Sequence, residues 1–172
     1  HHGFDEFFGV PYSNDMEPYY YLRGDERLSE PVDRDNQIRR YTEEAISFIR
    51  KHRDEPFFLY FAHAMPHTPL AASDAFQGKS KRGRFGDAVE EIDSSAGQIL
   101  DALRELELDD NTLVIFTSDN GPWHARGEDG GSAFPLRSAK GSTYEGGVRV
   151  PCVMWWPGTI PPGTVCRQVA AT

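Results

Sequence analysis

Cysteine is scarce in this chain: only Cys152 and Cys166 occur among 172 residues. Two thiols are too few to form a metal cluster of their own. They could form one disulfide that closes a short loop, which would indicate an oxidising compartment, or they could be two free, partly buried thiols. The sequence leaves both alternatives open, because it does not show how closely the two Cα atoms approach.

Positive charge and long apolar runs are scarce as well. Lys and Arg total 18 against 27 Asp and Glu, so the formal net charge is −9. Without a basic stripe, the composition argues against binding to nucleic acid. The longest uncharged run covers residues 56–73, and Pro66 and Pro69 interrupt it, so we expect no membrane-spanning helix.

Two segments have the apolar spacing of amphipathic helices. One covers residues 36–53, with Asp35 or Asn36 as the candidate N-cap, and the other runs from Asp87 to Leu106. Apolar residues recur in both at steps of three and four. In the first helix they are Ile38, Tyr41, Ala45, Ile46 and Ile49; in the second they are Val89, Ile92, Ala96, Ile99, Leu103 and Leu106.

Three short apolar runs predict strands, at residues 56–62, 112–118 and 150–156. The first two are continuous and rich in β-prone residues, which is typical of strands buried on both faces. Residues 3–34 have an irregular composition that predicts a loop with at most one short strand. The order of helices and strands indicates an α/β fold, in which ligand-binding groups gather at the carboxyl ends of strands.

Asp119 and Asn120 directly follow the second predicted strand. A carboxylate beside an amide oxygen suits a hard cation such as Ca²⁺ or Mg²⁺. The alternative is an ordinary Asp-Asn-Gly turn. Two ligands do not complete a site, so further ligands would have to come from elsewhere.

Three other side chains could take part in chemistry. His67 lies in a loop between two prolines, so it is either a well-positioned acid or anion donor, or a solvent-exposed loop histidine. His63 is more typical of a packed, structural histidine. Lys140 lies in the glycine-rich segment 138–149, where it could hold an anion or be a solvated lysine; the segment lacks the Gly-Lys-Ser/Thr order of a phosphate-binding loop.

Taken in order, six segments of the chain resemble the sulfatase family, in its branch of arylsulfatase A and N-acetylgalactosamine-6-sulfatase. The resemblance covers nearly the whole chain. The most specific part is the pair Ser-Asp-Asn-Gly and Lys-x-x-x-Tyr-Glu-Gly-Gly in this order. The segments are residues 3–9, 56–62, 67–69, 86–93, 112–121 and 140–149.

The resemblance implies an alkaline-phosphatase-like sandwich, with a mixed, mostly parallel sheet between helix layers. It implies hydrolysis of the sulfate ester of a small molecule or a sulfated sugar, with Ca²⁺ or alternatively Mg²⁺. By motif, Asp119 and Asn120 match two metal ligands, Lys140 matches the sulfate-binding lysine, and His67 matches the histidine that contacts sulfate and protonates the leaving alcohol. A periplasmic, secreted or lysosomal location is implied as well.

The chain departs from the family pattern at the nucleophile. The family forms a formylglycine from a Cys/Ser-x-Pro-x-Arg motif, and no such motif occurs here. The paired aspartates of the metal site are also missing. We therefore expect residues 1–172 to be an internal part of a single catalytic domain that lacks its N-terminal nucleophile segment and its C-terminal portion. We expect this part to be inactive alone and open to self-association. The alternatives are a phosphatase or phosphodiesterase of the same superfamily, or a non-catalytic binding protein on the same fold.

Overall fold

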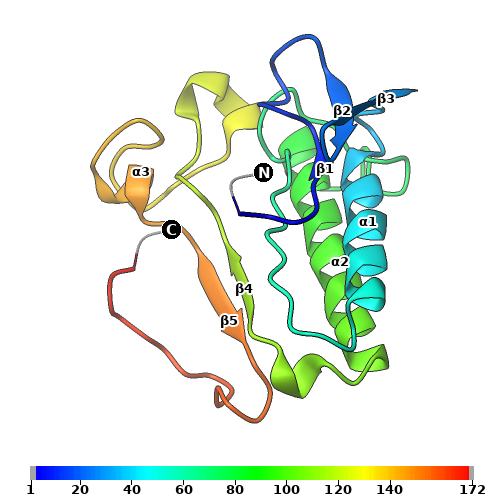
Figure 1. Ribbon diagram of the computed structural model, residues 1–172. Coiled ribbons are helices and arrows are strands. Elements are labelled where there is room, and N and C mark those ends of the chain that lie inside the picture. Colours follow the sequence, from blue (N-terminus) through cyan, green and yellow to red (C-terminus); the bar gives the residue numbers. More distant parts are fainter. Residues whose placement is uncertain (1–2, 171–172) are drawn as a thin grey trace. The chain divides into compact units, whose positions relative to one another are not determined.

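The computed structural model describes residues 3–170, which divide into two compact units, residues 3–102 and 103–170 (Figure 1). The first unit contains three short strands and two helices. These elements are β1 (Phe8–Gly9), β2 (Tyr20–Arg23), β3 (Glu26–Pro31), α1 (Gln37–Lys51) and most of α2 (Gly83–Glu105). No helix within residues 3–170 combines the length and apolar character needed to cross a membrane.

The first three strands form an antiparallel sheet in the order β1-β2-β3. Aromatic contacts attach this sheet to α1: the ring of Tyr21, which is buried, stacks on Phe8 at 5.1 Å and meets the edge of Tyr41 of α1 at 6.3 Å. The expectation of a loop with at most one strand was therefore wrong. The three strands are too short to show the alternation of apolar and polar residues by which a strand is recognised in a sequence. The contacts between aromatic rings hold them in place.

Both predicted helices are confirmed, with α1 at Gln37–Lys51 and α2 at Gly83–Glu105. Asn36 is the N-cap residue of α1, but its side chain donates to Asp33 Oδ2 at 2.7 Å and makes no bond to the helix end. The predicted apolar face of α1 is buried, except that Ile46 is only partly covered. On α2, Val89 is exposed, so the buried face lies slightly to one side of the predicted one.

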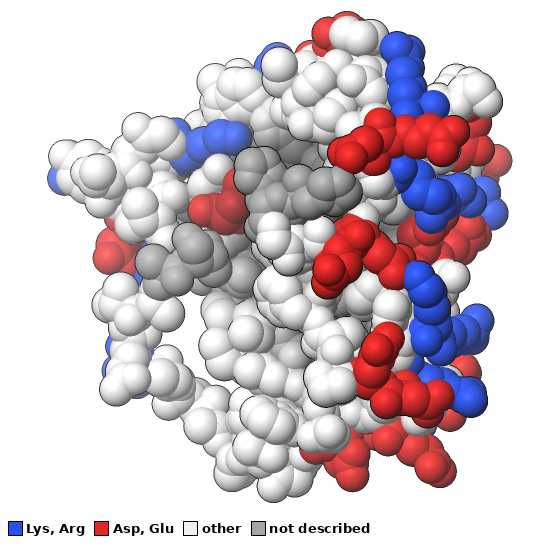
Figure 2. All heavy atoms as spheres, in the orientation of Figure 1, with Lys and Arg blue, Asp and Glu red and all other residues white. Residues whose placement is uncertain are grey.

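The two helices pack through a mixed interface in the first unit. An apolar cluster joins Ile38 of α1 to Ala88 and Ile92 of α2, with Met65 from the intervening loop. Beside it, the hydroxyl groups of Thr42 and Ser95 lie 2.6 Å apart, both buried. On the surface of α1, acidic and basic side chains pair at i,i+4, as Arg39 does with Glu43. Blue and red side chains lie interspersed along the right-hand side of Figure 2.

Residues 56–62 are extended but do not form the predicted buried strand, because the described residues provide no neighbouring strand for them. Their side chains alternate between two environments. Phe57 meets Phe48 of α1 at 5.8 Å, whereas Phe58 and Tyr60 are 74% and 72% exposed. The prediction that residues 56–62 are buried on both faces was therefore wrong, because only one face of this segment is covered.

The second unit contains two strands and three short helical segments. The strands β4 (Val114–Thr117) and β5 (Cys152–Trp155) confirm the predictions at 112–118 and 150–156 and pair antiparallel. β4 is not buried on both faces, since Ile115 and Phe116 are 51% and 47% exposed. The helical segments are η1 (Asp109–Asn111), η2 (His124–Gly130) and α3 (Glu145–Val148).

Two expectations about connections differ from the structure. All strand pairs within residues 3–170 are antiparallel, so the parallel neighbours of the expected sheet are not found in this part of the chain. Cys152 and Cys166 are free and exposed rather than joined or partly buried. The disulfide alternative is therefore not realised in the structure.

Candidate active-site loops

His67, the first predicted site residue, lies in the loop between residues 62 and 70 of the first unit. Its ring nitrogen Nδ1 is 3.0 Å from Asn14 Oδ1 and 2.8 Å from the carbonyl oxygen of Thr68. The side chain is half-buried. His67 is therefore held in place by the fold, and the alternative of a solvent-exposed loop histidine is wrong.

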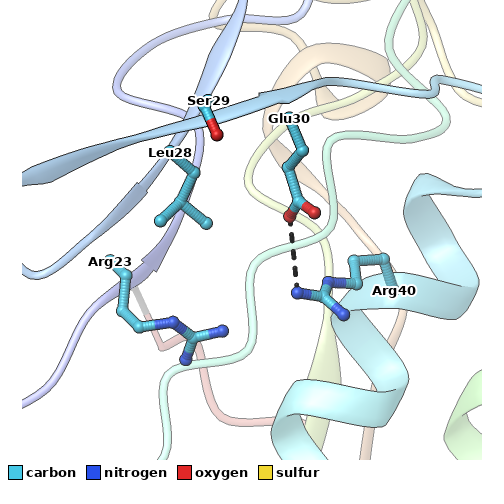
Figure 3. Close-up of a pocket in the computed structure, with 5 residues that line it drawn as sticks. All are labelled: Arg23, Leu28, Ser29, Glu30 and Arg40. Carbon is cyan, nitrogen blue, oxygen red and sulfur yellow. Dashed lines mark hydrogen bonds and ion pairs between the residues drawn. The ribbon is translucent and has the colours of Figure 1, made fainter.

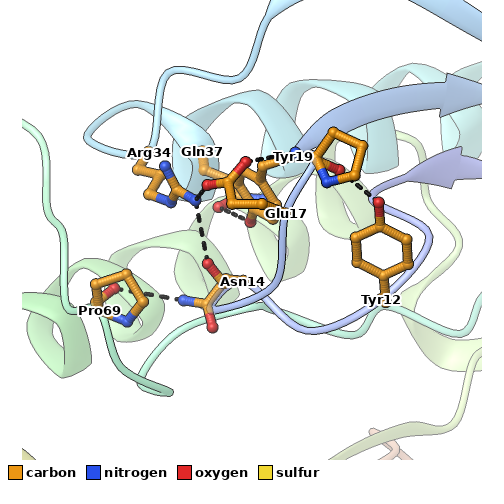
Figure 4. A network of polar contacts seen from close by, with 8 residues as sticks. Tyr12, Asn14, Glu17, Tyr19, Arg34, Gln37 and Pro69 are labelled. Carbon is orange, nitrogen blue, oxygen red and sulfur yellow. Dashed lines mark hydrogen bonds and ion pairs between the residues drawn. The ribbon is translucent and has the colours of Figure 1, made fainter.

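Asn14 belongs to a polar network that links the N-terminal loop to the His67 loop (Figure 4). Arg34 donates to the backbone oxygen of Asn14 at 3.3 Å and to the carboxylate of Glu17 at 3.0 Å. The hydroxyl of Tyr19 donates to Gln37 Oε1 at 2.9 Å, which ties the same loop to α1. Asn14 could not be identified from the sequence, because the partners of its side chain in the His67 loop lie more than 50 residues away.

The segment that follows His67 is anchored to α2 by two carboxylates. Glu91 accepts a hydrogen bond from the backbone N–H of Ser73 at 2.8 Å. Asp87 accepts three, from the N–H groups of residues 78–80 at 2.8–3.1 Å. The backbone hydrogen bonds to Ser80, Gly78 and Lys79 hold the pKa of Asp87 below its usual range, because they stabilise the carboxylate. α2 therefore serves as the support for this loop.

His63 precedes this loop and is packed as a structural histidine, as its sequence context indicated. Its ring lies 4.4 Å from that of Phe61 and 6.5 Å from that of Tyr41, between centroids. Nε2 is 3.3 Å from the hydroxyl of Ser95, and Nδ1 is buried without a hydrogen-bond partner. Burial lowers the pKa of His63 to about 4, so the ring is neutral at physiological pH.

Asp119 and Asn120, the predicted metal ligands, follow β4 in the second unit. Asp119 is exposed. The Asn120 amide nitrogen donates to the carbonyl oxygen of Gly121 at 2.9 Å, so Oδ1 is the part of this amide available to a cation. The two residues thus offer a carboxylate and an amide oxygen, which is the donor chemistry of Ca²⁺ and Mg²⁺ sites. Within the described residues, no three His, Cys, Asp or Glu side chains cluster as a metal site.

The loop that carries Lys140 is joined to the Asp119 loop through the backbone. Lys140 N–H donates to the carbonyl oxygen of Pro122 at 3.0 Å, and Gly121 N–H donates to that of Gly147 at 2.9 Å. A Cβ atom on Gly121 would overlap the carbonyl group of Gly146. The glycines therefore allow backbone to approach backbone, and they bring the two motifs together.

The side chain of Lys140 is exposed and lies beside an aromatic ring. Its Nζ is 5.4 Å from the ring centroid of Trp123, and the guanidinium of Arg126 is 4.3 Å from the same ring. The backbone N–H of Trp123 donates to the carbonyl oxygen of Gly130 at 3.0 Å, which fixes the position of this residue. Two cations thus share one aromatic ring near the Asp119 loop, an arrangement that can attract an anion.

A separate pocket of about 270 Å³ lies between β3 and α1 (Figure 3). Its arginines are already paired: Arg40 is 3.4 Å from Glu30, and Arg23 makes a bidentate contact with Glu44 at 2.5 and 3.0 Å. The charges in and beside the pocket therefore balance. None of the predicted site residues lines it.

Comparison with solved structures defines the fold class. The chain superposes on the PsFucS1 sulfatase from Pseudoalteromonas sp. with a TM-score of 0.75 and 32% identity, covering 83% of this chain and 30% of that one. The described units are thus part of the alkaline-phosphatase-like α/β fold of sulfatases. The sequence model of the sulfatase family matches residues 1–172, and the chain belongs to this family.

Two curated relatives agree with the branch suggested by the motifs. Over 188 residues the chain is 42% identical to human N-acetylgalactosamine-6-sulfatase, covering 99% of this chain and 36% of the relative. It is 37% identical to human arylsulfatase A over 197 residues, covering 100% of this chain and 39% of the relative. The chain therefore spans little more than a third of the length of these relatives. Family membership fits a metal cofactor and a formylglycine in general terms.

Proposed function

We propose that the protein to which this chain belongs is a sulfuric ester hydrolase of the arylsulfatase type. The observation that carries the proposal is the backbone connection between the Asp119 loop and the Lys140 loop, through Lys140 N–H to Pro122 and Gly121 N–H to Gly147. It holds a pair of oxygen ligands close to a cationic side chain. The substrate class is a sulfated sugar or another small sulfate ester, in keeping with the name of the 42% identical relative.

Each residue has a defined role in this proposal. Asp119 and Asn120 supply oxygen ligands to a divalent cation, Ca²⁺ by family resemblance with Mg²⁺ as the alternative. When bound, such a cation polarises the sulfate oxygens. Lys140 binds the sulfate and offsets the negative charge that grows in the transition state. His67 contacts the sulfate and donates a proton to the leaving alcohol oxygen as its bond to sulfur breaks.

The proposal extends to parts of the protein that residues 1–172 do not supply. Since the chain has no Cys/Ser-x-Pro-x-Arg motif, we propose that the formylglycine nucleophile comes from another part of the same catalytic domain. The 172-residue chain alone is then inactive toward sulfate esters, because catalytic groups that act as a unit lose nearly all activity when a key member is missing. A periplasmic, secreted or lysosomal location is proposed from the family alone.

The test is an assay of the complete enzyme against 4-nitrophenyl sulfate and 4-nitrophenyl phosphate. We expect Asp119→Ala to lower kcat/KM for the sulfate ester by about 10²-fold or more, because the cation loses a charged ligand. Asp110→Ala removes another exposed carboxylate of the same unit and serves as the matched control, with activity within about twofold of wild type. Full activity in Asp119→Ala, or faster hydrolysis of the phosphate ester, would overturn the proposal.

A further inference from the structure

A buried amide lies against the loop that carries His67. The side chain of Asn14 is 1% exposed and comes from a turn in the N-terminal loop. We propose that Asn14 is a positioning residue that fixes the ring of His67 with its proton on Nδ1, so that Nε2 is the nitrogen that gains and loses the proton. The catalytic use of that proton rests on the proposed function, whereas the state of the ring does not.

The contacts of Asn14 determine which way its amide points. Nδ2 donates to the backbone oxygen of His67 at 3.0 Å and approaches that of Pro69 at 3.4 Å. Carbonyl oxygens only accept hydrogen bonds, so the NH₂ group must face them. Oδ1 is then the atom that faces His67 Nδ1 at 3.0 Å, and a flipped amide would place an oxygen against two carbonyl oxygens.

The amide orientation in turn determines the tautomer of His67. Asn14 Oδ1 and the Thr68 carbonyl oxygen, 2.8 Å from Nδ1, are both acceptors, so Nδ1 must carry a hydrogen. In the neutral ring the basic lone pair then lies on Nε2. The imidazolium form keeps the same hydrogen on Nδ1. The ring can therefore change protonation at Nε2 without turning over or exchanging its partners at Nδ1.

Asn14 is itself held by neighbours that do not take part in the contact with His67. Its backbone oxygen accepts the bond from Arg34, whose guanidinium also lies 4.1 Å from the ring of Tyr19 and pairs with Glu17. A buried amide is costly unless its polar atoms are paired, and here both ends of the amide are paired. The N-terminal loop thus presents Asn14 to the His67 loop as a rigid, fully bonded group.

The first experiment is nitrogen-15 NMR of the histidine rings in the 172-residue chain at neutral pH. His67 is assigned by loss of its signals in His67→Gln. For the neutral form of the wild-type ring we expect the chemical shifts of the Nδ1–H tautomer, which is the less common tautomer of a histidine in water. A wild-type ring protonated mainly at Nε2 would overturn the proposal without the need for any variant.

Variants sharpen this measurement. Asn14→Ala removes one of two acceptors at Nδ1, so we expect the tautomer ratio to move about fivefold toward Nε2–H, as loss of one hydrogen bond of typical net strength brings. Asn14→Asp keeps an acceptor oxygen at Nδ1 and should keep a hydrogen on that nitrogen, but it loses the donor to the backbone oxygens of His67 and Pro69 and should unfold at a lower urea concentration. Thr42→Val, which loses a buried hydroxyl elsewhere in the same unit, is the matched control and should leave the ratio unchanged. An unchanged ratio in a folded Asn14→Ala chain would contradict the proposal.

Kinetics of the complete enzyme test the catalytic consequence separately. We expect Asn14→Ala to lower kcat about tenfold for a sulfate ester with a poor leaving group and less than threefold for 4-nitrophenyl sulfate, with KM little changed, because only the poor leaving group needs the proton. Equal losses for both esters would contradict a positioning role in proton transfer. If the enzyme hydrolyses no sulfate ester, the proposed function fails, while the NMR result still decides the tautomer.

Discussion

The His67 loop and the Lys140 loop are held by different kinds of contact. In the first unit, buried side chains reach the loop from elsewhere in the sequence: Asn14 bonds to His67, and Asp87 and Glu91 bond to the following backbone. In the second unit, the Lys140 loop is held to the Asp119 loop by backbone groups that come together where glycines leave room. The first loop should therefore be sensitive to removal of side chains, and the second to their addition.

The largest expected effect is that of an added methyl group in the second unit. Gly121→Ala places a Cβ against the carbonyl group of Gly146, so the two loops must separate. We expect a loss of about 4 kcal/mol or more, since backbone rather than a flexible side chain must move. All three tryptophans lie in the second unit, so fluorescence during urea unfolding reports on it directly. An unchanged midpoint would show that the loops are not held by this close approach.

A second effect concerns pH in the first unit. His63 has a pKa of about 4 when folded and an ordinary value of 6.5, so the unfolded chain binds more protons between these values. The stability due to the neutral ring is thus complete above pH 6.5 and falls by about 3 kcal/mol as the pH drops to 4. Circular dichroism at the helix band during urea unfolding measures it. His63→Phe should remove the fall in unfolding free energy between pH 6.5 and pH 4. The same pH profile in this variant and in the wild type would contradict the role given to His63.

A smaller effect is expected for Asp87→Asn, which keeps an acceptor oxygen but loses the charge. The variant should be less stable than wild type at neutral pH, because the carboxylate accepts three backbone hydrogen bonds. The difference is fully present above the ordinary carboxyl pKa of 3.8 and is lost as the pH falls through the lowered folded value. Urea midpoints at pH 7 and pH 2.5 compare the two proteins. A difference that persists at the lower pH would show that charge is not the cause.

The smallest expected effect is a gain in stability rather than a loss, and it serves as the control for Gly121→Ala. Gly97 lies within α2, and a Cβ there meets no atom within 4 Å. We expect Gly97→Ala to stabilise the first unit by about 0.5–1 kcal/mol, because alanine loses less backbone entropy in a helix. Helix-band circular dichroism during urea unfolding measures it. Destabilisation by this variant would mean that open space around a glycine does not predict tolerance of an added methyl group.

The helices were predictable from sequence because each carries its own hydrogen bonds and only needs one apolar face. The burial of residues 56–62 and of β4 was not predictable, because burial of a strand depends on segments far away in the sequence. The Asp119 and Lys140 motifs pointed to specific residues, yet the role of the glycines emerged only from backbone contacts. Asn14 carries no local signal at all, since a buried asparagine in a loop is identified by partners more than 50 residues away.

The extended segment at residues 56–62 has a consequence for hydrogen exchange. Its backbone amides find no strand partner in the described part of the chain, whereas the amides of α1 before it and α2 after it are bonded within their helices. Deuterium should therefore enter residues 56–62 much faster than either helix. A molecule that pairs as a strand with residues 56–62 would slow this exchange. The exchange rate of these amides therefore measures whether the segment has a strand partner.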